Sequence, residues 1–216
     1  EMLCGARITT TYHRPSGVFA DAPEEFWPAL KEFLEETPHL MNEFENLVSG
    51  NEIVVSRMRG VSVVAADVLI NASASGPILR AAGVDWDLRD KDPYEFYSLV
   101  KFNRPLMTES DNYSRYLVRV HEVYESLKII EQCVQQIEPG PPRDPNVPFV
   151  IRPPVGDAYA HIEGPKGELG FYLVSDGGVS PYRCKVRPPS LINLTLLREM
   201  LIGLKMADLF VTFGTI

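Results

Sequence analysis

The chain has 216 residues, of which 45% are apolar and 23% are charged, a balance typical of a folded globular protein. Its formal net charge of −8 argues against a nucleic-acid partner, because such binding needs a basic surface. No apolar run approaches the roughly 20 residues that span a bilayer, so we expect no transmembrane segment. The three cysteines (Cys4, Cys133 and Cys184) form no C-x-x-C pair and predict neither a disulfide framework nor a cysteine metal site.

Several common functional motifs are absent from the sequence. It contains no G-x-G-x-x-G, no Walker loop, no H-E-x-x-H and no G-x-S-x-G, so the residues alone predict no nucleotide site, zinc site or serine triad. The chain begins at Glu1 without an initiator methionine and ends at Ile216 within an apolar run. Because domain ends are usually polar and exposed, we interpret the chain as a fragment or as one with trimmed ends.

Helical periodicity is the main pattern of the first half of the chain. Apolar residues at helix spacing predict a helix over residues 24–36, which Pro38 is expected to end, and a second helix over residues 39–48. The segments that follow are short: residues 51–59 fit a helix or a strand, 60–64 a strand or buried turn, 65–71 and 75–82 short helices, and 84–89 a strand.

The strongest helical signal covers residues 111–137, where apolar side chains form one continuous stripe. Ser110 or Asp111 is expected to cap the start of this helix. The sequence Pro139-Gly140 is expected to mark its end, before a proline-rich loop. This helix is predicted to be the central element of the fold.

Beyond this loop the period changes from that of a helix to that of strands. Residues 159–163 alternate, residues 169–174 and 182–187 read as strands, and the turn between these last two contains Gly177. A final helix is expected over residues 191–204. The sequence therefore predicts an α+β fold with one domain, made of a helical part (1–138), a β-rich part (157–187) and a C-terminal helix (188–216).

A lysine lies between two glycines just before a predicted strand, in the segment Gly164-Pro165-Lys166-Gly167. Small neighbours would let a ligand approach the backbone and the ammonium group closely. An ordinary turn with a surface lysine explains the same pattern, and the local sequence alone favours that alternative.

A second basic motif places three positive charges on one face of a predicted strand. Arg183, Lys185 and Arg187 are at alternate positions, so they could hold an anionic group or raise a neighbouring redox potential. A charged solvent face is the alternative that spacing alone favours. Cys184 points to the opposite face and is expected to be a packed core thiol.

An ordered set of motifs resembles one known family across nearly the whole chain. The set comprises residues 5–7, 12–18, 75–84, 86–89, 93–94, 115–130, 139–141, 165–170, 174–178 and 181–193. Together these motifs are similar to the quinone-site subunit of respiratory complex I (NADH-quinone oxidoreductase), which belongs to the superfamily of the large subunit of [NiFe] hydrogenases. The resemblance implies a hydrogenase-like fold, and it makes this chain the C-terminal half of a longer subunit.

The resemblance also implies a site. The family has lost the nickel cysteines, and the vacated region forms part of a ubiquinone or menaquinone chamber beside an iron–sulfur cluster on a neighbouring subunit. By this resemblance the chain holds no metal or cofactor itself, carries no catalytic residue, and directs Arg7 towards the cluster. The residues expected to line the chamber are Lys166, Gly167, Arg187, Pro189 and Ser190.

The function implied is that of one subunit of a proton-translocating NADH:quinone oxidoreductase, inactive alone. Its partners would be the iron–sulfur subunit and the other peripheral-arm and membrane-arm subunits. It would lie peripherally on the cytoplasmic (or matrix-equivalent) side of an energy-transducing membrane. Two alternatives stay open: a hydrogenase-like large subunit of a ferredoxin- or F420-fed membrane oxidoreductase, and an inert scaffold fragment.

Three departures from the family pattern limit the comparison. Thr9 is found where many members carry a histidine next to the cluster, which puts pH-coupled tuning of the cluster in doubt. Ser16 replaces the first residue of a usual Gly-Gly pair. The loop between Pro153 and Gly164 is shorter than usual, and the headgroup-binding His and Tyr of the family would precede Glu1.

Overall fold

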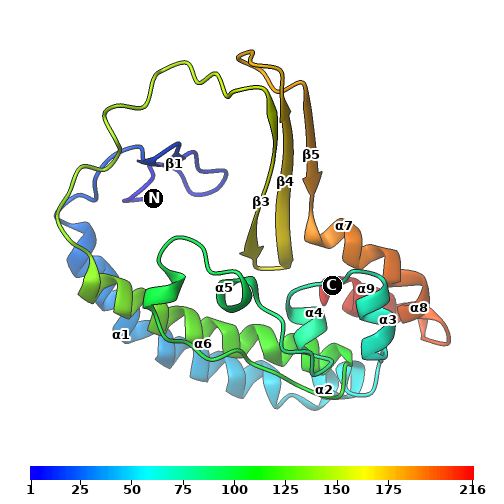
Figure 1. Cartoon of the computed structure of the whole chain (residues 1–216). Helices are drawn as coiled ribbons and strands as arrows, with labels where there is room; N and C mark the ends of the chain where they lie inside the picture. The colour runs from blue at the N-terminus through cyan, green and yellow to red at the C-terminus, as the bar shows by residue number, and fades with distance from the viewer.

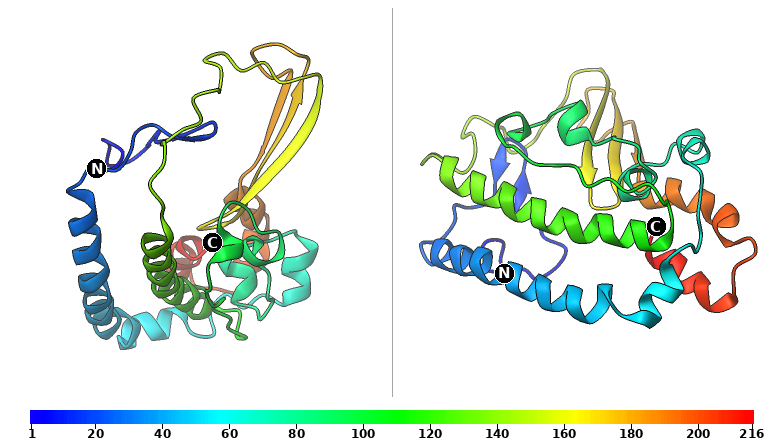
Figure 2. Two further views of the ribbon diagram at one scale, coloured as in Figure 1. Left: turned by 60° about the vertical axis from the view of Figure 1, so that its left-hand side comes forward. Right: turned by 90° about the horizontal axis from the view of Figure 1, so that it is seen from below.

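The computed structural model describes all 216 residues and arranges them as a helical base with a small sheet standing away from it (Figure 1). The two longest helices, α1 (Phe26–Phe44) and α6 (Asn112–Gln136), lie side by side along the base (Figures 1 and 2). The N-terminal segment carries the paired strands β1 (His13–Arg14) and β2 (Gly17–Val18). None of the helices is both long and apolar enough to cross a membrane.

The prediction that Pro38 ends the first helix is wrong, because α1 continues through this residue to Phe44. A proline inside a helix leaves one carbonyl group without an N–H partner. No residue of α1 is fully buried, so water can reach that group and lowers the cost of the interruption. The helix ends instead in a π-helical turn, Glu45–Ser49, before α2 (Glu52–Met58).

The predicted long helix is confirmed as α6, and Asp111 is its cap. One oxygen of the Asp111 carboxylate accepts a hydrogen bond from the Ser114 amide at 2.7 Å. The other oxygen accepts from the amide of Gly60, also at 2.7 Å. The cap therefore satisfies the helix start and also fixes the 60–64 turn, which is irregular and not the strand that alternation allowed.

The apolar core lies where short helices meet at one end of α6. Leu69 and Ile78 are fully buried there and pack with Met200. The helices that supply or surround this core are α3 (Ala66–Asn71), α4 (Pro77–Arg80), α7 (Pro189–Asn193), α8 (Leu197–Leu201) and α9 (Met206–Gly214), with a 3₁₀ turn at Leu194–Leu196. The predicted helix over 191–204 is therefore present in its first part, and a separate helix follows it.

A polar core lies beside the apolar one and is organised by a buried arginine. Arg115 donates to the carbonyl groups of Ser110 (2.8 Å) and Ser62 (3.0 Å) and to the side chains of Asn112 (2.6 Å) and Thr215 (3.2 Å). Loss of hydration lowers the pKa of Arg115 to about 10. These bonds connect the start of α6 to the segments on both sides of it, which explains why a charge can be buried there.

The sheet consists of three antiparallel strands in the order β3-β4-β5, as the alternation predicted. They are β3 (Gly156–Gly164), β4 (Gly167–Ser175) and β5 (Arg183–Arg187). One face is polar, and the other carries Ile162, Phe171 and Val186, which are 44%, 43% and 44% exposed. Cys184 belongs to this second face, but it is exposed, so the prediction of a packed core thiol is wrong.

The predicted strand over residues 84–89 is also wrong. The segment is irregular and then forms the short helix α5 (Leu88–Lys91), followed by a 3₁₀ turn at Tyr97–Leu99. Asp87 accounts for the difference, because its carboxylate accepts a hydrogen bond from the Arg89 amide at 3.0 Å and so caps the helix. Alternation over such a short stretch cannot distinguish these two outcomes.

We predict that Ile78→Ala lowers the free energy of unfolding by about 3 kcal/mol, because it removes a fully buried side chain from the core. Ile53→Ala is the matched control, since Ile53 is 73% exposed and its loss is expected to cost under about 0.5 kcal/mol. Urea titration followed by circular dichroism measures both values. Equal destabilisation by the two variants would show that the core is not where the structure places it.

Candidate functional site

The turn that joins β3 to β4 packs directly on the start of α4. Pro165 and Lys166 form this turn between the paired residues Gly164 and Gly167. Gly76 and Gly167 both have positive φ, +79° and +126°, and a Cβ on either would overlap the backbone of the other segment. The glycines next to Lys166 therefore permit a contact within the protein, whereas the sequence had suggested a close approach by a ligand.

A buried asparagine connects this turn to the C-terminal helices. The Asn193 side chain donates to the carbonyl groups of Lys166 (3.2 Å) and Ser75 (3.4 Å), and it accepts from the Ser75 amide at 3.4 Å. The Ser75 hydroxyl accepts from the amide of Glu168 at 3.0 Å. Three segments that are distant in sequence thus meet at one point, which we call the turn junction: residues 75–77, 164–168 and 187–193.

The structure brings the predicted chamber residues together at the turn junction. Lys166 and Gly167 belong to the turn, and Arg187 ends β5 beside it. Pro189 and Ser190 form the half-buried start of α7, which follows directly. Arg7 is elsewhere: it lies in the exposed N-terminal segment and pairs with Glu1 at 3.2 Å, away from the junction in every view (Figures 1 and 2).

Arg187 is held firmly by backbone groups of the junction. Its guanidinium donates to the carbonyl group of Glu168 at 2.7 Å and to that of Ser73 at 2.8 Å. It also lies 3.5 Å from the Glu168 carboxylate. Arg183 and Lys185, which share the strand, have no ion-pair partner and are exposed. The predicted face of three charges therefore divides into one positioned cation and two solvated ones.

Lys166 is a half-buried cation without a carboxylate partner. Its ammonium group donates to the backbone carbonyl of Ile216 at 2.5 Å. Burial lowers the pKa of Lys166, and the positive charge of Arg119 on α6 lowers it further. Burial likewise lowers the pKa of Arg119, whose guanidinium donates to the Arg115 carbonyl at 2.7 Å. The junction is consequently an electropositive region in a chain whose net charge is negative.

A buried ionic cluster supports the junction from below, and no pattern in the sequence pointed to it. The Arg80 side chain is 2% exposed and contacts the carboxylates of Glu122 (2.6 Å), Glu163 (2.8 Å) and Asp87 (3.4 Å). Burial raises the pKa of Glu163 although Arg80 opposes this shift. Arg89 also pairs with Asp87, at 2.7 Å. The partners of Arg80 come from α6, β3 and the residue that caps α5, so this one side chain joins the sheet to the helical base.

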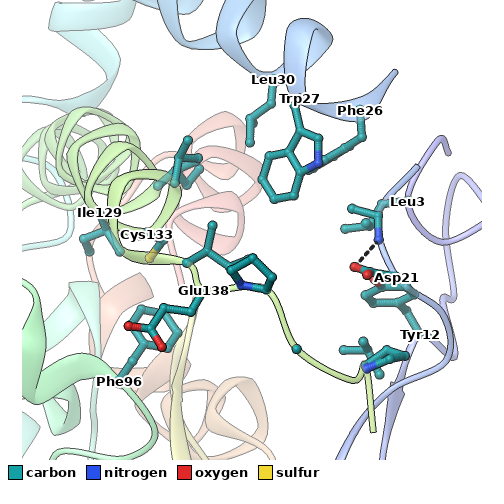
Figure 3. Close-up of a pocket in the computed structure, with 18 of the residues that line it drawn as sticks. Leu3, Tyr12, Asp21, Phe26, Trp27, Leu30, Phe96, Ile129, Cys133 and Glu138 are labelled. Carbon is teal, nitrogen blue, oxygen red and sulfur yellow. Dashed lines mark hydrogen bonds between the residues drawn. The ribbon is translucent and has the colours of Figure 1, made fainter. Parts of the chain in front are cut away.

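A large apolar groove lies away from the turn junction (Figure 3). It has a volume of about 910 Å³ and runs between the N-terminal segment, α1 and the end of α6. Its lining includes Leu3, Tyr12, Phe26, Trp27, Ile129 and Cys133. Burial raises the pKa of the Cys133 thiol, which therefore stays protonated and is a poor nucleophile. No predicted site residue lines this groove.

The donor groups of the chain do not form a metal site. No three His, Cys, Asp or Glu side chains come together in an arrangement that could hold a metal ion. The chemistry that the turn junction can perform with its own residues is to position cations beside a ligand that carries or develops negative charge.

These features define a subunit-type protein whose fold recurs in respiratory membrane complexes. A solved structure of a membrane-bound sulfane sulfur reductase, an archaeal respiratory membrane complex, contains a chain that matches 99% of this one with a TM-score of 0.92 and 34% identity. The match covers 59% of that chain. Both structures thus share the mixed α+β architecture described above.

The family model for the 49-kDa subunit of respiratory-chain NADH dehydrogenase matches residues 1–151 and 146–216, and the chain belongs to this family. It is 47% identical over its full length to a subunit of the NADH-quinone oxidoreductase of Dehalococcoides mccartyi. It is 44% identical to the subunit of the same name in Roseiflexus. It spans 59% and 60% of the length of these two relatives.

We predict that Gly76→Ala destabilises the protein by about 3 kcal/mol or more, because the new methyl group would strike the Gly167 backbone and φ is positive. Gly50→Ala is the matched control: Gly50 has ordinary φ and open space around it, so we expect a change within about 0.5 kcal/mol. Thermal unfolding measures both, and a tolerated Gly76→Ala would contradict the close contact.

We predict that Arg80→Met lowers the free energy of unfolding by about 3–5 kcal/mol, because it leaves three carboxylates buried without their cation. Arg183→Met, on the exposed strand face, is expected to change it by less than about 0.5 kcal/mol. Chemical denaturation compares the two variants. A mild effect of Arg80→Met would show that the cluster does not hold the sheet.

Proposed function

We propose that this chain forms part of the quinone-reducing region of a proton-translocating NADH:quinone oxidoreductase, as a subunit that is inactive alone. The observation that carries the proposal is the convergence of Lys166, Gly167, Arg187, Pro189 and Ser190 at one junction. Family membership supports it, since the relatives bear the name of this oxidoreductase. Residues 165–193, which carry the resemblance, are thus also the residues that meet in space.

The chemistry follows from the charge at the junction. Quinone reduction adds two electrons and two protons, and negative charge develops on the quinone oxygens as electrons arrive. On this proposal Lys166 and Arg187 stabilise that charge from fixed positions, while Pro189 and Ser190 form part of the wall. The quinone is the substrate, and this chain holds no cofactor. Electrons come from an iron–sulfur cluster on a neighbouring subunit, towards which Arg7 in the N-terminal segment would face.

The proposal extends to the architecture and the partners of the chain. Its fold would be that of the large subunit of [NiFe] hydrogenases, and residues 1–216 would be one domain in the C-terminal half of a longer subunit. The iron–sulfur, peripheral-arm and membrane-arm subunits would surround it. The location would be peripheral, on the cytoplasmic or matrix-equivalent side of the membrane. Relatives longer than this chain support the view that other segments complete the subunit.

A second function is favoured by the structural match. The sulfane sulfur reductase shares this architecture while its name describes different chemistry. The same chain could therefore belong to a hydrogenase-like complex fed by ferredoxin or F420. Identification of the electron-input subunit that copurifies with the chain distinguishes the two functions.

We predict that Lys166→Gln lowers kcat/KM for quinone reduction by about tenfold in the assembled complex, because one positioned charge is lost. Reduction of ferricyanide, which takes electrons before the quinone site, is expected to stay unchanged. Steady-state assays with NADH and a soluble quinone measure both activities.

The matched control is Lys185→Gln, which removes an equally charged but exposed and unpaired lysine from β5. It is expected to leave both activities intact. If Lys166→Gln behaves like Lys185→Gln, the junction does not contact the quinone and the proposed site is wrong.

A further inference from the structure

A histidine on the polar face of the sheet bridges two carboxylates from different parts of the fold. His161 on β3 contacts Glu168 on β4 through Nδ1 and Asp92, which follows α5, through Nε2. Both distances are 2.9 Å. The bridge therefore joins the sheet to the helical base at a second point, beyond the buried cluster of Arg80.

Only the protonated ring fits this environment. A neutral imidazole has one N–H group and one lone pair, so between two ionised carboxylates one nitrogen would face an oxygen without a hydrogen. The imidazolium donates through both nitrogens and satisfies both acceptors. The contact to Asp92 consequently depends on the charge of His161, whichever tautomer the neutral ring adopts.

The position of His161 along the strand determines what the bridge does. The turn of the hairpin is fixed by Gly76 and Gly167, and Glu163 is fixed by Arg80. His161 is the next residue on the same face, roughly 7 Å further from the turn. Beyond it, the side-chain hydrogen bonds of β3 stay within the sheet, which stands away from the base (Figure 1). The bridge is thus the outermost polar attachment of β3 and sets the angle at which the sheet leaves the base.

We propose that His161 is a positioning residue: as an imidazolium it holds β4 and the Lys166 turn against the helical base, and it releases this hold when it loses its proton. This proposal rests on the function proposed above. Lys166 and Arg187 would be the groups that touch the substrate, and His161 would act only through them.

The connection to the site runs through Glu168, which is shared. Its carboxylate accepts from His161 and from Tyr159 (2.8 Å), and it lies 3.5 Å from Arg187. Its backbone amide donates to Ser75, and its carbonyl accepts from Arg187. Movement of Glu168 after His161 is neutralised would therefore reach Arg187 and the turn junction together.

The charged groups around His161 favour its protonated form. The hydrogen bond with Asp92 raises its pKa above 6.5 most strongly, and that with Glu168 follows, while burial opposes both. Tyr159 on the same strand and Arg187 behind Glu168 are the other titratable groups that face it. Because the folded-state pKa is raised, the stabilisation is complete below pH 6.5 and is lost as pH rises through the higher value.

The first test is hydrogen exchange of the full chain across this pH range, corrected for the intrinsic exchange rate. We expect amides of residues 156–164 to exchange roughly fivefold faster once His161 is neutral, as suits a partly exposed ion pair. In His161→Gln this pH dependence is expected to disappear. His39→Gln, which alters an exposed histidine of α1, is the matched control and should behave as the wild type.

The second test uses the assembled complex and the pH profile of quinone reduction. His161→Gln is expected to remove an alkaline-side decline that His39→Gln retains, while ferricyanide reduction keeps its profile. If exchange depends on pH through His161 but quinone reduction does not, the bridge exists and the positioning role is wrong. If exchange in His161→Gln keeps the wild-type pH dependence, the bridge itself is wrong. Failure of the Lys166→Gln prediction would instead overturn the proposed function, and the exchange result would still decide the bridge.

Discussion

The close contact between Gly76 and Gly167 is the constraint on which the rest of the structure depends. Two backbones can approach this closely only where neither carries a side chain. The contact fixes the β3–β4 turn on the start of α4, and Asn193 then ties the C-terminal helices to the same point. The residues gathered at the turn junction take their positions from this arrangement, including Lys166, which would otherwise belong to a mobile hairpin tip.

Charge burial is the second principle of the fold, and it works through arginine. Arg80 gathers three carboxylates, whereas Arg115 uses mainly backbone and hydroxyl acceptors. The two solutions have different consequences. Carboxylates compensate the Arg80 charge, but Arg115 keeps a net positive charge in a poorly hydrated region, which is why its pKa falls to about 10. The excess positive charge extends towards Arg119 and Lys166, in a chain that is acidic overall.

The sequence predicted those parts of the fold that depend on local patterns. The stripe of α6, the cap at Asp111 and the alternation of β3 to β5 are each visible within one window of residues. Pro38 and the segment 84–89 were misread because exposure and a cap outweighed the general rule. The assembly of Lys166 with Arg187 followed from the family resemblance and not from spacing. Arg80 was missed, since its partners Glu122 and Glu163 are 42 and 83 positions away and no local pattern encodes such a cluster.

The two-residue turn between β3 and β4 has a consequence for how the chain can vary. Side chains alternate between a charged face and an apolar face, so the register of the hairpin decides which residues meet the helical base. An insertion of one residue at Pro165 would exchange the two faces of a strand and turn Ile162 or Phe171 towards Arg80. The connection from β4 to β5 at residues 176–182 has no such role and is exposed along most of its length. Length variation in this hairpin is therefore tolerable at its far end and forbidden at the end that carries the lysine.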